Sequence, residues 1–221
     1  MRLSPFAYAC FVIPVGTIVV CYLITTSVHP DFPVCFPFVS GCASISATAR
    51  QEPSIHLFRL MMLPISALFA AYWCVSAAWL KQLDGRSARG LCGLGMLSAA
   101  FLALYAVFLG TDGDLYQLLR RFGTTTYFGG TGVAAIMLTA RIWPLQHQNP
   151  ADFPPAVLRA FFVDCFLMLG IGIAYIPVAE LLDAAWLENV FEWNYAFLLH
   201  IHFGLVSILW RRQGLRINLS S

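Results

Sequence analysis

The chain has 221 residues, of which 59% are apolar and 11% are charged, and its formal net charge at pH 7 is +2. Soluble domains contain roughly 45–50% apolar and about 25% charged residues, so a soluble globule of this size would have no room to bury so much apolar surface. The 13 basic and 11 acidic residues also leave no basic excess for binding nucleic acid, and the composition predicts an integral membrane protein.

Apolar segments of about 20 residues are long enough to cross a hydrocarbon core of ~30 Å as helices. Six such segments occur, at residues 6–26, 57–80, 91–110, 124–143, 160–182 and 189–210. They are continuously apolar, whereas the strands of a membrane barrel alternate over about ten residues. We therefore expect an all-α, polytopic integral membrane protein with six transmembrane helices in one bundle, forming a single domain over residues 1–221.

The first segment, residues 6–26, follows Arg2 and has some features of a secretory signal. Its apolar stretch is longer than the usual core of about 7–15 residues, and no small-residue cleavage motif closes it before His29. We expect a retained helix, with cleavage as the alternative.

A long loop, residues 27–56, follows the first segment and contains Cys35 and Cys42. In an oxidising compartment a disulfide between them would restrict the loop, although spacing alone does not show that the two side chains converge. A zinc site is the less favoured alternative, because no CxxC or HxxxH spacing accompanies the pair. The remaining cysteines lie in predicted helices, where we expect them to pack as small apolar residues: Cys10, Cys21, Cys74, Cys92 and Cys165.

The positions of the basic residues predict the orientation, because cytoplasmic loops carry an excess of Lys and Arg. With the N-terminus in the cytoplasm, the cytoplasmic side collects Arg2, Lys81, Arg86, Arg89, Arg141, Arg159, Arg211, Arg212 and Arg216. The outer side then has only Arg50, Arg59, Arg120 and Arg121. We expect both the N- and C-termini in the cytoplasm and residues 27–56 outside, in the plasma (inner) membrane if the protein is bacterial.

Small and hydroxyl residues open the fourth segment, at residues 124–132. Glycines allow helices to approach closely and hydroxyls bond across the interface, so we expect this stretch to serve helix packing. In the fifth segment, Asp164 lies about one turn from Arg159, and we expect an interfacial carboxylate beside that cation.

The sixth segment carries a polar stripe near its start. At about 100° per residue, one narrow face holds Glu188, Glu192, Tyr195, Leu199 and His202. Such a stripe should face other helices or a wet cavity rather than lipid. We predict an outer cavity that binds a lipid headgroup, formed by Arg59, Arg120, Arg121, Glu188 and Glu192; the alternative is a structural salt-bridge network that joins helix ends.

Catalytic templates give little information. The chain has no GxSxG or HExxH motif. A membrane hydrolase or acyltransferase would need a proton carrier and a carboxylate that orients it, for which the candidates are His56 and Glu192. We predict no cofactor and no metal site.

Short elements in the first loop and the last segment resemble a known family. They are PFVS at 37–40, SISATA at 44–49, Glu52-Pro53, Phe58-Arg59 and Phe191-Glu192-Trp193. With six spans and a long first outer loop, the chain resembles the Frag/DRAM/Sfk family, also called the Cwh-like N-terminal domain family. The resemblance implies a six-helix membrane domain found in proteins that remodel GPI-anchor lipids, modulate autophagy or influence phospholipid distribution.

Membrane lipids are therefore the expected partners, with no nucleic acid and an undetermined oligomeric state. The favoured interpretation is a lipid-associated membrane protein that engages a phospholipid or glycolipid headgroup in an outer-facing polar cavity. One alternative is a lipid acyltransferase or hydrolase that uses His and Glu at the outer face. A small-solute transporter is a further alternative, because Pro14, Pro64 and Pro177 lie within predicted spans, although no internal repeat accompanies them.

Overall fold

The computed structural model describes residues 2–181 and 184–215, and this part of the chain is all-helical, as predicted. Within these residues, six long helices make up the bundle: α1 (Ser4–Val28), α4 (Ser54–Asp84), α5 (Arg89–Phe108), α6 (Asp114–Ile142), α8 (Pro155–Leu181) and α9 (Ala185–Arg212). Short helices lie in the connections: α2 (Pro37–Ser40), α3 (Ile45–Ala49) and α7 (Leu145–Gln148).

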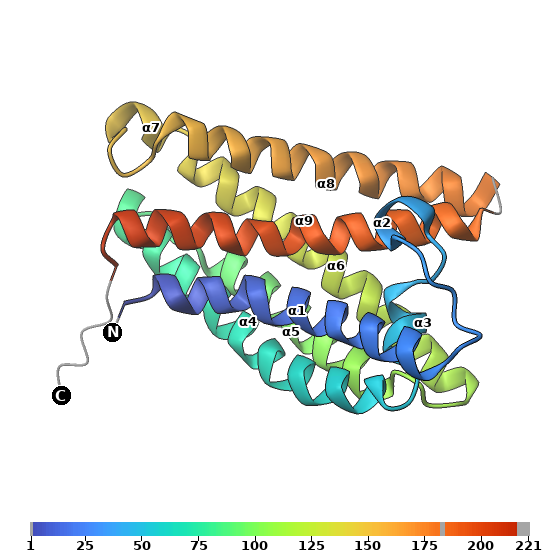
Figure 1. Ribbon diagram of the computed structural model, residues 1–221. Helices are drawn as coiled ribbons and strands as arrows, with labels where there is room; N and C mark the ends of the chain where they lie inside the picture. The colour runs from blue at the N-terminus through green and yellow to red at the C-terminus, as the bar shows by residue number, and fades with distance from the viewer. Residues whose placement is uncertain (1, 182–183, 216–221) are drawn as a thin grey trace, which may run out of the picture.

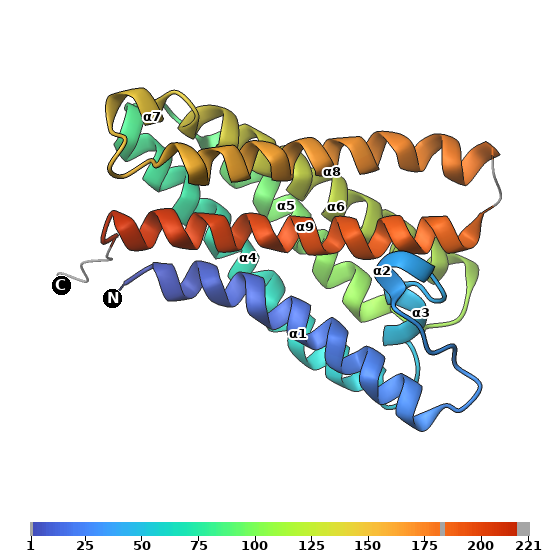
Figure 2. The ribbon, with the colours of Figure 1, turned by 45° about the horizontal axis from the view of Figure 1, so that its top comes forward.

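The long helices form a closed ring in which each packs against the one before it, and α9 returns to pack against α1 (Figures 1 and 2). The backbone N–H of Leu3 donates to the carbonyl oxygen of Leu215 at 3.0 Å, which joins the start of α1 to the end of α9. The connection between α1 and α4, residues 29–53, contains α2 and α3 and covers the opposite end of the bundle. We call this connection the cap, and the end that it covers the cap end.

Five of the described helices are long and apolar enough to cross a membrane: α1, α4, α5, α8 as far as Tyr175, and α9. The protein is therefore an integral, multi-pass membrane protein. The sixth predicted span corresponds to α6, which is not among these candidates, so the count of six stays a prediction.

The predicted start of the fourth segment, at residue 124, is wrong, because α6 already begins at Asp114. Its first three turns mix Leu115, Leu118 and Phe122 with Arg120 and Arg121, so the average apolarity of this stretch is low although one face is apolar. The other long helices begin a few residues before their predicted starts, and α1, α4 and α9 also end a few residues beyond their predicted ends. The helix α5 instead ends at Phe108, two residues before its predicted end, and the predicted end of the fifth segment, residue 182, lies outside the described residues.

Aromatic side chains from α4 and α9 fill the centre of the bundle. The ring of Phe203 stacks on Phe69 with 4.8 Å between centroids and meets Tyr72 edge-on at 4.7 Å. Trp73 is also buried, and a Cβ at Gly95 of α5 would overlap its side chain, so the glycine lets α5 approach α4 closely. This rigid core holds the helices from which the cap-end side chains project.

The cysteines in the helices only partly follow the prediction. Cys10, Cys21 and Cys165 are free and buried, as expected for small apolar residues. Cys74 of α4 and Cys92 of α5 are instead joined by a disulfide, which corrects the expectation for these two. The two cysteines come together because α4 and α5 pack closely, and the sequence of either helix alone does not predict this contact.

Candidate functional site: a polar cavity at the cap end

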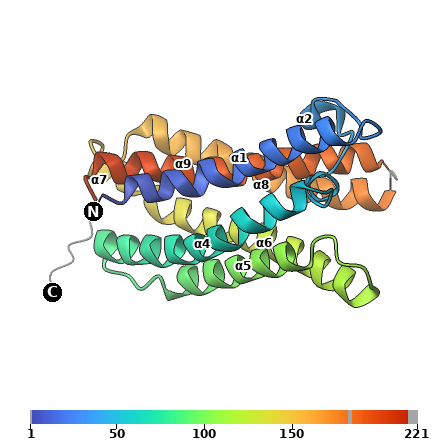
Figure 3. The same cartoon turned by 60° about the horizontal axis from the view of Figure 1, so that its bottom comes forward.

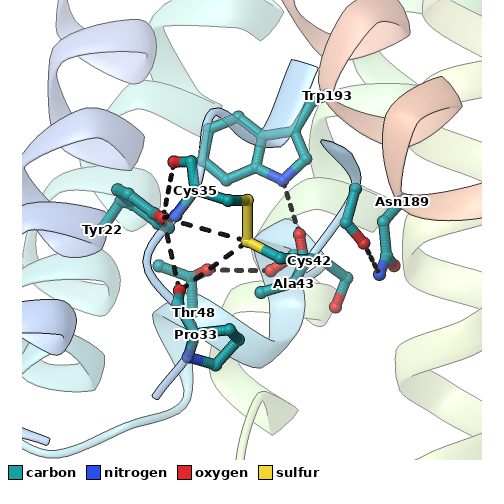
Figure 4. The surroundings of a disulfide bond; sticks show 10 residues. Tyr22, Pro33, Cys35, Cys42, Ala43, Thr48, Asn189 and Trp193 are labelled. Atoms are coloured by element: carbon teal, nitrogen blue, oxygen red, sulfur yellow. Dashed lines mark hydrogen bonds between the residues drawn. A yellow bond between two sulfur atoms is a disulfide. The ribbon is translucent and has the colours of Figure 1, made fainter. Parts of the chain in front are cut away.

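A disulfide joins Cys35 to Cys42 and closes a small loop in the cap (Figure 4). The hydroxyl of Tyr22, near the end of α1, donates to the carbonyl oxygen of Cys35 at 2.9 Å and accepts from the Cys35 N–H at 2.9 Å. The cap is thus attached both to itself and to the first long helix. The structure therefore has the predicted disulfide between Cys35 and Cys42, and two sulfurs joined in a disulfide are not thiolate ligands for zinc.

Side chains on one face of α9 bind the backbone of the cap. Asn189 donates to the carbonyl oxygen of Gly41 at 2.8 Å, and the indole N–H of Trp193 donates to that of Ala43 at 2.9 Å (Figure 4). Asn194 donates to the carbonyl oxygen of Phe38 at 2.8 Å. Each of these bonds gives a hydrogen-bond donor to a carbonyl oxygen of the cap, whose backbone is not part of a sheet or a long helix.

Gly41 allows this contact for two physical reasons. Its φ of 56° lies in the left-handed region, which residues with a Cβ rarely adopt. A Cβ at this position would also overlap the backbone oxygen of Trp186, in the first turn of α9. The glycine therefore lets the backbone of the cap rest directly on the start of α9.

Docking of the cap places two hydroxyls and a helix start beside Glu192. The Ser44 hydroxyl caps α3 by accepting from the Ala47 N–H at 2.9 Å, and it lies 3.1 Å from the Ser46 hydroxyl. The carboxylate of Glu192, on α9, faces the backbone N–H groups of Ile45 and Ser46. The SISATA and FEW elements of the sequence thus meet in space, where Ser44, Ser46 and Glu192 form one wall of a cavity.

The cavity has a volume of about 730 Å³, within the range of roughly 300–1,000 Å³ that is typical of ligand pockets. Its walls come from the cap and from four helices, α5, α6, α8 and α9. The polar and aromatic lining residues are Ser44, Ser46, Tyr105, Gln117, Arg120, Arg121, Thr124, Thr125, Phe128, Tyr175, Glu188, Asn189, Phe191, Glu192 and Tyr195. Gly129, Ile171 and Gly172 complete it on α6 and α8.

Four of the five residues predicted to bind a ligand line this cavity: Arg120, Arg121, Glu188 and Glu192. The Tyr175 hydroxyl donates to the Glu188 carboxylate at 3.2 Å. Among the side chains that the structure describes, contacts of a basic with an acidic group within 4.0 Å join His56 to Glu52, Arg141 to Asp84 and His202 to Asp164, and none involves these four residues. The cavity charges therefore do not form the salt-bridge network that was the alternative prediction.

Arg59, the fifth predicted ligand residue, lies elsewhere. Its guanidinium donates to the carbonyl oxygen of Leu109 at 2.5 Å, directly after the end of α5, and it does not line the cavity. A cation at a helix C-terminus satisfies a carbonyl that has no partner within the helix and complements the helix dipole. Arg59 therefore holds α4 to α5, and its predicted place in the cavity is wrong.

The two catalytic candidates are not brought together. His56 lies 2.9 Å from Glu52 in a surface pair whose side chains are 72% and 68% exposed, and it does not line the cavity that contains Glu192. No histidine is among the residues that line this cavity. The described residues contain no group of three or more His, Cys, Asp or Glu that would hold a metal ion.

Asp164 occupies a different environment from the one predicted. Its side chain is 3% exposed and lies 3.4 Å from the imidazole of His202, which is 1% exposed. The expectation of an interfacial carboxylate beside Arg159 is therefore wrong. The pair is buried between α8 and α9, and its carboxylate and imidazole approach each other without a hydrogen bond.

Sequence reasoning missed several lining residues, among them Ser44, Ser46, Gln117, Asn189 and Tyr175. The two serines belong to the SISATA element, so their membership in a family element was the available signal. Asn189 was visible as a polar residue at the start of the sixth segment. Nothing in the sequence indicated that Tyr175, on an apolar helix, would reach Glu188.

One of three comparisons with known proteins identifies the family of this chain. The Frag1/DRAM/Sfk1/Cwh43P N-terminal domain family matches residues 2–208, nearly the whole chain. Comparison with curated proteins and with solved structures gives no significant match. The protein is thus a member of the Frag1/DRAM/Sfk1/Cwh43P N-terminal domain family, an all-helical, multi-pass membrane protein.

Proposed function

We propose that this protein binds the headgroup of a phospholipid or phosphorylated glycolipid in the cavity at the cap end. The observation that carries the proposal is the presence of Arg120 and Arg121 with Glu188 and Glu192 in one cavity of about 730 Å³, in a protein built of membrane-spanning helices. The guanidinium groups bind the lipid phosphate, because their planar donors match its oxygens two at a time.

The acidic residues complement the rest of the headgroup. Glu188 and Glu192 only accept hydrogen bonds when ionised, so they suit the ammonium of an ethanolamine or the hydroxyls of a glycerol or sugar. Ser44 and Asn189 add neutral hydrogen-bonding groups to the same wall. The site is thus built for a headgroup that carries both a phosphate and hydrogen-bond donors.

The position of the cavity along the helices favours a lipid. It lies at the cap end, where α8 ends and α9 begins. The ends of membrane-spanning helices are expected near the depth of the lipid phosphates, which supports a lipid ligand. With both termini in the cytoplasm, as the distribution of basic residues predicts, this is the outer leaflet.

The test is the lipid that stays with the purified protein. In Arg121→Ala we expect the amount of retained phospholipid per protein to fall about tenfold, because a charge-assisted hydrogen bond contributes roughly 1.5–3 kcal/mol. Arg89→Ala is the matched control, since Arg89 is an exposed arginine at the opposite end of the bundle. Mass spectrometry of extracted lipid is the measurement, and equal retention in the two variants would contradict the proposal.

A further inference from the structure

The helices α6 and α8 touch at one end and separate at the other. Away from the cap, the Cys165 thiol donates to the Thr139 hydroxyl at 3.3 Å, and the rings of Trp143 and Phe162 lie 5.6 Å apart. Toward the cap end, α6 runs obliquely away from α8 and approaches α5 (Figures 1–3). Both helices line the cavity in this separated part, α6 through Thr125 and Gly129 and α8 through Ile171, Gly172 and Tyr175.

Glycines on the two walls border unfilled space. A Cβ at Gly129 would meet no atom within 4 Å, and one at Gly172 would meet only a ring carbon of Tyr195 at 3.9 Å. The neighbouring glycines of α6 behave differently, since a Cβ at Gly130 would overlap the Ser98 hydroxyl and one at Gly132 would overlap that of Tyr195. Gly130 and Gly132 thus serve helix packing, as predicted, whereas Gly129 and Gly172 leave the space between α6 and α8 open.

Apolar residues flank this open part of the cavity. On α6, the side chains of Leu118 and Phe122 are 51% and 56% exposed, and on α8 that of Ile173 is 62% exposed. Exposed apolar residues on membrane-spanning helices face acyl chains rather than water. With α6 in the membrane, as the sequence predicts, the charged part of the cavity adjoins the lipid-facing surface of this helix, because Arg121 lies directly before Phe122.

We propose that a phospholipid reaches the cavity sideways from the bilayer, between α6 and α8, and that one acyl chain lies along Gly129 and Gly172 while the phosphate binds Arg121. This inference rests on the proposed function and specifies it: the ligand is an intact bilayer lipid, held by its chain as well as by its headgroup. A water-soluble phosphorylated headgroup would have no use for the apolar, glycine-lined part of the cavity.

The first experiment fills the gap. A leucine side chain in Gly172→Leu or Gly129→Leu should extend into the space that the lipid acyl chain occupies. Gly170→Leu is the matched control, because a Cβ at Gly170 also meets nothing within 4 Å but this residue does not line the cavity. We expect phospholipid retention to fall about tenfold in Gly172→Leu and Gly129→Leu, since each buried CH₂ contributes about 0.8 kcal/mol and 1.4 kcal/mol is tenfold. Gly170→Leu should keep the retention of the unsubstituted protein, with gel filtration and thermal unfolding reporting the fold of each variant.

The second experiment uses the unsubstituted protein and needs no variant to fold. The protein is placed in phosphatidylcholine vesicles that contain phosphatidylethanolamine with a photoreactive group on one acyl chain, and the crosslinked peptides are identified by mass spectrometry. We expect adducts on the segments around Gly129 and Gly172 that excess glycerophosphoethanolamine in solution does not compete away. Adducts spread over all the lipid-facing helices would overturn the inference.

The outcomes separate this inference from the proposed function. If Arg121→Ala loses lipid while both leucine variants retain it, the cavity binds a headgroup but the path between α6 and α8 is wrong. If soluble glycerophosphoethanolamine displaces the lipid, the ligand is recognised from water and the inference is again overturned. If neither the arginine nor the glycine substitutions change retention, the proposed function fails with it.

Discussion

Replacement of Gly41 by alanine should release the cap from α9. A Cβ in the left-handed region costs roughly 1–2 kcal/mol. At Gly41 the Cβ also overlaps the Trp186 oxygen, and overpacking of this kind costs typically about 1–3 kcal/mol. The displacement breaks the bond from Asn189 to the Gly41 carbonyl, which contributes about 1 kcal/mol.

Gly85→Ala is the matched control for this substitution. Gly85 has a φ of 69° and ends α4 at the other end of the bundle, but a Cβ there meets no atom within 4 Å. It therefore carries the cost of the left-handed backbone without the overlap. The difference between the two variants, about 3 kcal/mol, isolates the contact between the cap and α9.

Hydrogen exchange of the cap peptides in detergent micelles is the assay. In the cap of Gly41→Ala all three contributions act together, and a loss of about 4–5 kcal/mol in local stability corresponds to exchange about a thousandfold faster in residues 36–49, with the cap of Gly85→Ala unchanged. Lipid retention should fall in Gly41→Ala as well, because Ser44 and Ser46 leave the cavity wall. Cap exchange that is the same in both variants would refute the role assigned to Gly41.

Three further outcomes are expected. Asp164→Ala should lower the free energy of unfolding by about 3–5 kcal/mol, because it leaves the buried His202 without its partner. Adding His202→Phe should recover part of this loss. A double variant that is less stable than Asp164→Ala alone would contradict the pairing of the two residues. Cys35→Ser should speed hydrogen exchange in the cap, because the disulfide closes a short loop and a cross-link of this size contributes about 2 kcal/mol; unchanged exchange would show that the disulfide does not stabilise the cap. Single cysteines placed at Asp112 and Arg86 should react with impermeant reagents from opposite sides of the membrane, the first from outside, and labelling from one side would refute the predicted orientation.

The fold class could be predicted from the composition, because apolar segments of about 20 residues occur mainly as membrane-spanning helices. The start of α6 did not follow, since Leu118 and Phe122 alternate with Gln117 and Arg121 around the same turns. A linear reading averages these residues into a polar stretch. The helix separates them by face, so that the arginine lines the cavity and the leucine is exposed.

For the candidate site, periodicity was informative within one helix and uninformative between helices. The stripe on α9 correctly placed Glu188, Glu192 and Tyr195 on one wall, because 100° per residue is fixed by backbone geometry. The partners of Asp164 and Arg59 could not be predicted in this way. Each partner belongs to a neighbouring helix or to its end. The rotation of that helix about its axis and its shift along the bundle are not specified by the sequence of a single segment.

The cap and the cavity depend on the same helix, and this links the family elements to the proposed binding site. Asn189, Trp193 and Asn194 of α9 bind the backbone of the cap. Glu188 and Glu192, which directly precede Asn189 and Trp193 in the sequence, line the cavity. A rotation of α9 would therefore disturb the docking of the cap and the charges of the site together. Because the cap in turn places Ser44 and Ser46 on the wall beside Glu192, the proposed headgroup site would be complete only while the cap is docked.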